Sequence, residues 1–127
     1  MGKKILVVDD DISLREMLNL TLKTLGYDVS LAENWKKALN LLKSENFDIL
    51  MTDFQMPPME GITNGIELIR FVKLNEINSE MKIILMSAEM NESIELVALA
   101  AGTDAAVNKF EICRIEAIKK LLELDIS

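Results

Sequence analysis

The stretch Ile5-Leu-Val-Val-Asp-Asp10 sets the pattern of this chain, because it is a short apolar run that ends in acidic residues. A run of this length between polar residues is typical of a buried strand in a parallel sheet. Three further apolar runs are followed by polar residues: Ile49-Leu-Met-Thr52 by Asp53, Ile83-Ile-Leu-Met86 by Ser87, and Ala105-Ala-Val107, one residue on, by Lys109. The carboxyl ends of parallel strands open onto one crevice, so we expect these polar residues to meet there.

Stretches of helical period alternate with the apolar runs. In the first, we expect a capping box of Ser13 and Glu16 at the start and a left-handed stop at Gly26. The series predicts strands at Lys4–Val8, Asp28–Ala32, Phe47–Thr52, Lys82–Ser87 and Asp104–Val107, and helices at Ser13–Leu25, Asn34–Ser44, Gly65–Leu74, Glu92–Ala101 and Glu111–Leu124. Five strand–helix pairs joined by short connections predict an α/β fold with a doubly wound parallel sheet.

Composition narrows the function classes. The chain has 127 residues, half of them apolar, which predicts one globular domain over residues 1–127. It has neither an apolar run of membrane-spanning length nor a secretory signal, so we expect a cytoplasmic protein without membrane contact. A net charge of −7 argues against direct binding of nucleic acid, and the lack of histidine excludes imidazole catalysis. The single Cys113 is expected to be a small buried hydrophobe in the last helix.

The three consecutive acidic residues after the first apolar run indicate a nearby cation, because their charges repel one another. Asp9, Asp10 and Asp11 would repel one another by about 1–4 kcal/mol per pair at about 4 Å, so a cation is expected beside them. Mg²⁺ prefers carboxylate oxygens and keeps several waters, which makes it the natural candidate. Asp53, at the end of another strand, could act as a metal ligand or as a nucleophile. With Ser87 and Lys109, these residues describe a site for a divalent cation and a phosphoryl group.

At these positions the chain resembles, over essentially its whole length, the receiver domain of two-component response regulators, and the chemotaxis regulators in particular. The resemblance is carried by Ile5-Leu-Val-Val-Asp-Asp10, Asp53-Phe-Gln-Met-Pro57, Asn64-Gly-Ile-Glu-Leu68, Met86-Ser-Ala88 and Lys109. It implies a flavodoxin-like (βα)5 fold with strand order 2-1-3-4-5.

The resemblance also implies a phosphoryl-transfer site. Asp53 would accept a phosphoryl group from a phosphohistidine on a sensor histidine kinase or a histidine phosphotransfer protein. Ser87 would bind the phosphoryl oxygen, Lys109 would pair with it, and the changed conformation would signal to an output domain or a partner protein. In this family the domain catalyses its own phosphorylation and dephosphorylation.

Metal binding and hydrolysis are implied in the same way. Asp10 and Asp53 would ligate Mg²⁺ together with the backbone carbonyl of Gln55, and Asp9 would hold a metal-bound water. The side chains of Gln55 and Glu89 lie two residues past Asp53 and Ser87, at positions that tune hydrolysis in the family.

Three features depart from the family pattern. The segment 57–65 is longer than usual and offers two candidate glycines, Gly61 and Gly65. Phe110 follows Lys109 where the family usually has proline. Ala106 stands where many members have an aromatic ring that turns inward on activation, which excludes signalling through that ring.

Two alternative functions remain compatible with the sequence. A haloacid-dehalogenase-like phosphohydrolase would use Asp9 as nucleophile and Asp11 as general acid, but it leaves Asp53 without a role. A pseudo-receiver would keep the fold as a phosphate-independent interaction module, and the three departures are its only support.

Overall fold

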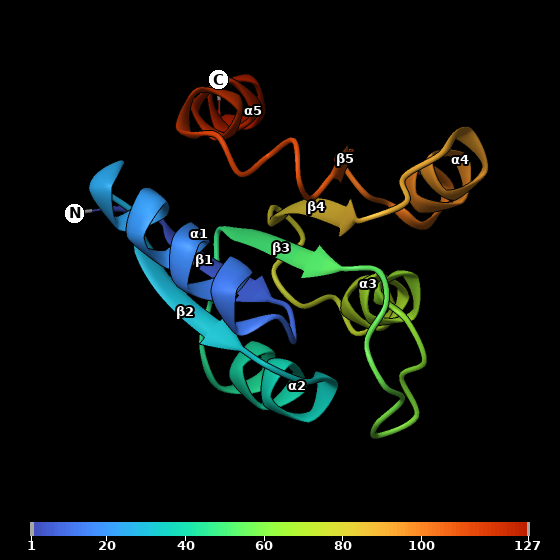
Figure 1. The fold of residues 1–127 in the computed structure, drawn as a ribbon. Coiled ribbons are helices and arrows are strands. Elements are labelled where there is room, and N and C mark those ends of the chain that lie inside the picture. Colours follow the sequence, from blue (N-terminus) through green and yellow to red (C-terminus); the bar gives the residue numbers. More distant parts are fainter. Residues whose placement is uncertain (1, 127) are drawn as a thin grey trace.

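The computed structural model describes residues 2–126 as five parallel strands flanked by five helices (Figure 1). The strands are β1 (Lys4–Val8), β2 (Asp28–Ala32), β3 (Ile49–Asp53), β4 (Lys82–Ser87) and β5 (Ala105–Asn108). The helices are α1 (Ile12–Thr24), α2 (Trp35–Ser44), α3 (Gly65–Leu74), α4 (Glu92–Ala101) and α5 (Ile115–Ile126). The sheet order is β2-β1-β3-β4-β5, as the resemblance implied. Within the described residues, no helix has the length and apolarity needed to cross a membrane.

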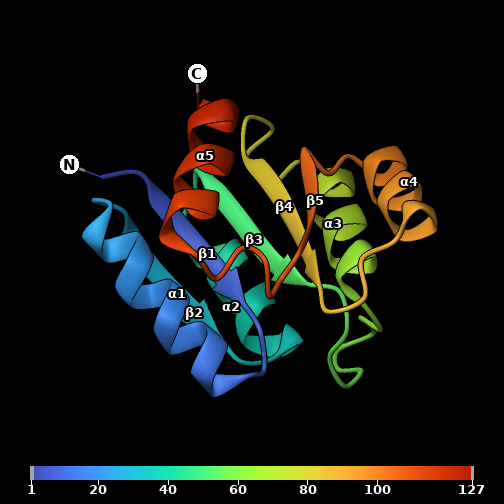
Figure 2. The ribbon, with the colours of Figure 1, turned by 45° about the horizontal axis from the view of Figure 1, so that its top comes forward.

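Helices cover both faces of the sheet and enclose a core on each (Figures 1 and 2). On one face, residues of α2, α3 and α4 pack against alternate residues of the strands, such as Leu6, Leu50 and Leu85. On the other face, α1 and α5 cover Ile5 and the other residues of opposite parity. Because β1, β3 and β4 are buried from both sides, their sequences are continuous apolar runs rather than alternating ones.

The predicted start of α1 is wrong. Asp11, not Ser13, is the N-cap: its side chain accepts hydrogen bonds from the backbone N–H groups of Ser13 (3.0 Å) and Leu14 (3.3 Å). Both residue types cap helices well, so the sequence offered two starts one half-turn apart. At the other end, Gly26 has φ 97° and follows the helix as predicted.

The predicted start of α5 is also wrong. Asn108 ends β5, and its side-chain oxygen accepts hydrogen bonds from the N–H groups of Phe110 (2.9 Å) and Glu111 (3.3 Å). The chain therefore turns after β5, and α5 begins only at Ile115. Cys113 consequently lies in this turn rather than in the helix. It is half-buried, its thiol donates to the Lys109 carbonyl (3.1 Å), and it packs against the core beneath α1 and α5.

The boundaries of two strands shift by one or two residues. β3 begins at Ile49 rather than Phe47 and includes Asp53 as its last residue, while Phe47 is buried just before it. β5 begins at Ala105 rather than Asp104. The Asp104 N–H donates to the Ile83 carbonyl (2.8 Å), but the Ile83 N–H donates to the Asp104 side chain (2.8 Å) rather than to a backbone carbonyl of β5. The apolar pattern of a sequence indicates which residues are buried. Because residues next to a strand can be buried without pairing in the sheet, this pattern does not fix where a strand begins.

The segment between β3 and α3 forms a small hairpin. Met59 and Ile62 exchange two backbone hydrogen bonds (3.1 and 3.0 Å), and Glu60 and Gly61 between them both have positive φ. This is the backbone of a tight type I′ turn. Gly61 thus serves the turn, whereas the other candidate glycine, Gly65, serves the start of α3.

The base of this segment is fixed to the end of β3. The N–H of Gly65 donates to the carbonyl of Phe54 (2.8 Å), and a Cβ atom at position 65 would overlap the carbonyl oxygen of Asp53. The next helix is then held by Asn64 as N-cap, which accepts from the N–H of Glu67 (3.0 Å). Glu67 in turn accepts hydrogen bonds from Thr63. The start of α3 is therefore locked beside the acidic residues.

Candidate functional site

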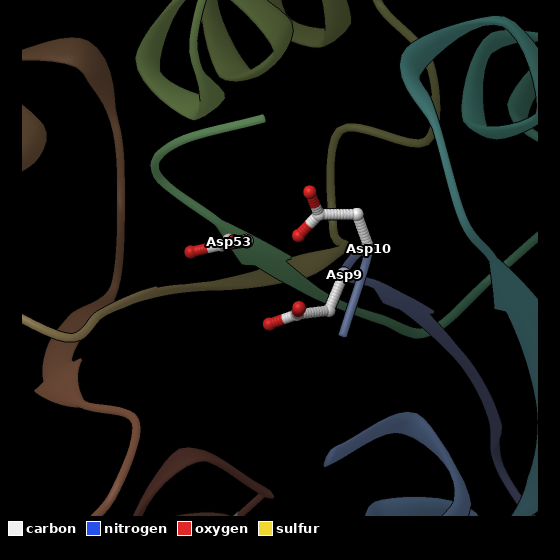
Figure 3. Close-up of side chains that lie close together, drawn as sticks. All are labelled: Asp9, Asp10 and Asp53. Carbon is white, nitrogen blue, oxygen red and sulfur yellow. The ribbon is translucent and has the colours of Figure 1, made fainter. Parts of the chain in front are cut away.

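Three carboxylates meet at the carboxyl ends of β1 and β3 (Figure 3). One oxygen from each of Asp9, Asp10 and Asp53 lies within 4.8 Å of the other two. Asp9 and Asp53 are buried, whereas Asp10 is exposed to solvent at the rim. The pairing of β1 with β3, which places Val8 beside Thr52, brings the following acidic residues together.

Lys109 reaches this cluster from the end of β5. Its Nζ lies 3.3 Å from Asp9 Oδ2 and 3.4 Å from Asp53 Oδ2, with little of its side chain exposed. The Lys109–Phe110 peptide bond is trans. The lysine therefore bridges two of the three carboxylates and offsets part of their repulsion.

The carboxylate of Asp9 is held by the loop that follows β1. Asp9 Oδ1 accepts a hydrogen bond from the N–H of Asp11 (2.8 Å), and the guanidinium of Arg15 donates to the Asp9 carbonyl (2.8 Å). The side chain of Asp11 instead caps α1. Of the three consecutive acidic residues, only Asp9 and Asp10 thus belong to the site. Arg15 is half-buried, and the sequence carries no pattern that would have singled it out among the polar residues of the helix.

Burial dominates the electrostatics of the site. Burial and the neighbouring charge of Asp9 raise the pKa of Asp53 to about 6, although Lys109 and the backbone of Gln55 act in the opposite direction. Burial likewise raises the pKa of Asp9. Burial alone would lower the pKa of Lys109, but Asp53 and Asp9 more than compensate and raise it. At neutral pH the Asp53 carboxylate is thus mostly ionised although it is poorly solvated, and Lys109 stays protonated beside it.

Ser87 ends β4 and is buried, and its Oγ accepts a hydrogen bond from the N–H of Glu89 (3.2 Å). The β3–β4 register places Asp53 beside Met86, the residue before Ser87, and the N–H of Lys109 donates to the Ser87 carbonyl (3.0 Å). Ser87 therefore belongs to the same edge of the sheet as the acidic cluster, as predicted.

Gln55 and Glu89 are both exposed on the loops after β3 and β4. Gln55 lines a hollow of ≈ 580 Å³ beside the cluster, together with Asp10, Pro57 and Asn64. The lengthened segment 57–65 thus forms one wall of the approach to the site. Ala106 lies half-buried in β5 and packs against the core beneath α2, α3 and α4.

The donor set fits a hard divalent cation. Three carboxylate oxygens within reach of one another are the ligands that Mg²⁺ prefers, and the exposed side of Asp10 leaves room for the waters that Mg²⁺ keeps. Lys109 approaches Asp9 and Asp53, whereas Asp10 is free of that contact within the described residues. The residues present therefore fit the metal that the sequence suggested.

Comparison with known proteins decides the family. The pattern of the response regulator receiver domain matches residues 5–122. The chain belongs to this family. The phosphate regulon transcriptional regulatory protein PhoB of Pseudomonas aeruginosa is 33% identical over 86% of the chain, which corresponds to 46% of that protein. The chemotaxis protein CheY of the same organism is 33% identical over 94% of the chain and 96% of its own length.

Solved structures agree with this assignment. The chemotaxis response regulator CheY4 of Vibrio cholerae superposes with a TM-score of 0.86 at 26% identity, covering 98% of this chain and 99% of that one. The five-stranded order of this receiver domain is that of the flavodoxin-like fold. Receiver domains of response regulators work with histidine kinases and output domains. Asp53 and the residues around it, Asp9, Asp10 and Lys109, are thus candidates for the functional site of this receiver domain.

Proposed function

We propose that this receiver domain accepts a phosphoryl group on Asp53 in a Mg²⁺-dependent reaction. One observation carries the proposal: Lys109 Nζ bridges Asp9 and Asp53 at 3.3 and 3.4 Å, directly beside a cluster that fits a divalent cation. The donor would be a phosphohistidine of a sensor kinase or a phosphotransfer protein. Cytoplasmic location, a single domain over residues 1–127 and signalling to an output domain or a partner protein stay predictions.

Each residue has a physical role in this proposal. Phosphoryl transfer requires alignment and neutralisation of charge more than covalent help. The Asp53 carboxylate, with a pKa of about 6, is mostly ionised at neutral pH and attacks without a general base. Lys109 neutralises charge on the phosphoryl oxygens. Asp10, Asp53 and the Gln55 carbonyl would hold Mg²⁺, with Asp9 binding a water on the metal, and the ion would supply further neutralisation of charge.

Asp11 bears on the phosphohydrolase alternative. That mechanism needs Asp11 as a general acid, but its carboxylate is the N-cap of α1 and accepts two backbone N–H groups. The family assignment points the same way. A phosphate-independent pseudo-receiver remains the competing outcome of the experiment. Incubation with acetyl phosphate, with and without Mg²⁺, followed by intact mass measurement, tests between the two.

Metal binding depends on Asp10 in this proposal. We expect Asp10→Ala to weaken Mg²⁺ binding by roughly tenfold or more, since it removes a ligand and a charge from a small cluster. Isothermal calorimetry measures the affinity. Asp11→Ser is the matched control, because it removes the adjacent charge but keeps an oxygen that can cap α1. Equal weakening in both variants would show a general charge effect rather than ligation.

Ser87 separates chemistry from signalling. We expect Ser87→Ala to be phosphorylated on Asp53 but to lose much of the structural response, because the hydroxyl offers a new contact rather than a nucleophile. In the present structure its Oγ is engaged by the N–H of Glu89, so the loop must rearrange for it to move toward Asp53. Amide chemical shifts report the response. Ser87→Thr, which keeps the hydroxyl, is the control, and a wild-type shift pattern in phosphorylated Ser87→Ala would contradict the role.

Gln55 and Glu89 are proposed to orient the water that removes the phosphoryl group. Both are exposed at the rim of the site. The position of the attacking water strongly affects the rate of phosphoryl transfer. We expect Gln55→Leu with Glu89→Leu to lengthen the phosphorylated state's half-life severalfold. Intact mass followed over time measures the decay, and Glu89→Gln, which keeps a polar group, is the control. An unchanged decay rate in the double variant would show that both residues are merely solvated.

A further inference from the structure

A groove between α3 and α4 has no role in the site described above. α3 and α4 lie side by side (Figures 1 and 2). Two hollows are lined by residues of both helices. One has a volume of ≈ 300 Å³ and the other ≈ 360 Å³, and both are lined in part by Arg70. We call the pair the α3–α4 groove. Its lining includes Phe54, Ile66, Arg70, Ile94 and Val97 in one hollow, and Arg70, Lys73, Leu74, Ala100 and Ala101 in the other.

The groove presents apolar surface to solvent. Leu74 is 83% exposed and Val97 46% exposed, and with Phe54, Ile66 and Ile94 they give the groove a largely apolar lining. Ala100 and Ala101, on the α4 wall, are small enough to let another backbone approach closely. Contiguous apolar surface of this kind is typical of interaction sites.

The charge of the groove is opposite to that of the whole chain. Its ionisable lining residues, Arg70 and Lys73, are both cations, whereas the chain carries a net charge of −7. Among the described residues, neither cation has a carboxylate within 4 Å. Glu67 lies three residues before Arg70 and feels its charge, but the Glu67 carboxylate is engaged by Thr63. Glu76 lies three residues after Lys73 and forms no ion pair with it. The stem of Lys73 is held against α4, because a Cβ atom at Gly102 would lie only 2.7 Å from Lys73 Cε.

We propose that the α3–α4 groove binds an amphipathic, acidic helical segment of a partner protein. Two ten-residue helices form the walls, so the groove extends about 15 Å, which matches just under three helical turns of a ligand. Arg70 and Lys73 are one turn apart, and they match two carboxylates spaced by one turn on the partner. Two cations on an acidic protein are too few to hold a nucleic acid or an anionic membrane.

The groove also adjoins the phosphorylation site without being part of it. Phe54 follows Asp53 directly, and it lines both the hollow beside Asp10 and the α3–α4 groove. The partner would therefore dock next to the acidic cluster. Docking itself requires only the groove residues, so it can be tested in the unphosphorylated protein, independently of whether Asp53 is an acceptor.

The test uses two fluorescein-labelled helical peptides of 14 residues. One has leucines along one face and glutamates flanking them, and the other has lysine at every glutamate position. Fluorescence anisotropy should show that the wild-type domain binds the acidic peptide at least tenfold more tightly. Arg70→Glu with Lys73→Glu should reverse this preference, and binding of the lysine peptide then shows that the variant is folded. Lys23→Glu with Lys36→Glu, on α1 and α2, changes net charge equally and should leave the preference intact.

Amide chemical shifts locate the bound peptide. We expect the largest shifts at Ile66, Arg70, Ile94 and Val97. Equal binding of both peptides, loss of the preference in the Lys23/Lys36 control, or shifts centred on α1 or α5 would overturn the proposal. So would a dimer in sedimentation velocity that Arg70→Glu abolishes, because the groove would then belong to a second copy of the chain.

Discussion

Incubation with acetyl phosphate and Mg²⁺ should add one phosphoryl group to the wild-type domain and none to Asp53→Asn. The amide oxygen is a poor nucleophile and cannot form the acyl phosphate, while the substitution preserves the size of the side chain. Because Asp53 is the sole acceptor in the proposed reaction, loss of phosphorylation should be complete rather than partial. Intact mass spectrometry reads out the adduct, which should be labile in base.

Three outcomes distinguish a phosphoaccepting receiver from a phosphohydrolase and from a pseudo-receiver. Asp28→Asn, at the opposite end of the sheet, should be phosphorylated normally. Peptide mapping that placed the adduct on Asp9 would support a phosphohydrolase-like nucleophile instead. Absence of any adduct in the wild-type domain with Mg²⁺ would indicate a pseudo-receiver. Omission of Mg²⁺ should prevent the reaction, since Lys109 alone leaves much of the charge at the site uncompensated.

Without metal, the acceptor carboxylate should cost the domain stability at neutral pH. The pKa of Asp53 is about 6 in the folded chain against a reference of 3.8, so the folded state holds its proton to higher pH than the unfolded state. Between about pH 4 and pH 6 the free energy of unfolding should therefore fall as pH rises. Allowing for screening by solvent at the open side of the site, the loss is about 1–3 kcal/mol.

Asp53→Asn should recover this stability at pH 7 and flatten the pH dependence. Urea unfolding followed by fluorescence of the fully buried Trp35, in buffer with a chelator, measures both effects. Mg²⁺ should stabilise the wild-type domain more than Asp53→Asn, because the cation compensates the charge that the variant lacks. Asp28→Asn is again the control. If Asp53→Asn were less stable than wild type at pH 7, the carboxylate would be a net stabilising group.

The sheet and the acidic cluster could be predicted from sequence because burial and strand order leave few choices. Runs such as Ile5–Val8 and Ile83–Met86 are too short and too apolar for surface helices, and parallel strands bring their ends together. The membership of Asp9, Asp10 and Asp53 in one cluster follows from that topology. The side-chain contact of Lys109 does not, because a residue after a strand can point to solvent or into the crevice.

Element boundaries were less predictable, for local reasons. At Asp11 and Ser13, two capping residues compete, and hydrogen-bond geometry rather than residue type decides. After β5, the side chain of Asn108 holds a turn that the apolar pattern of Ile112 and its neighbours conceals. Periodicity reports which residues are buried, but a turn packed against the core buries its residues as effectively as a helix does.

The contacts of Gly65 with Phe54 and Asp53 allow the segment between β3 and α3 to vary in length and sequence. Its N–H is bonded to Phe54, and its α-carbon abuts Asp53, so the two ends of the segment 55–64 are anchored beside each other. Lengthening a loop whose ends are already closed costs little entropy. Residues can therefore be inserted or exchanged around the Met59–Ile62 hairpin while the acceptor stays in place. The wall facing an incoming donor is thus the part of the domain most open to evolutionary and engineered change, and the natural place to graft a new specificity.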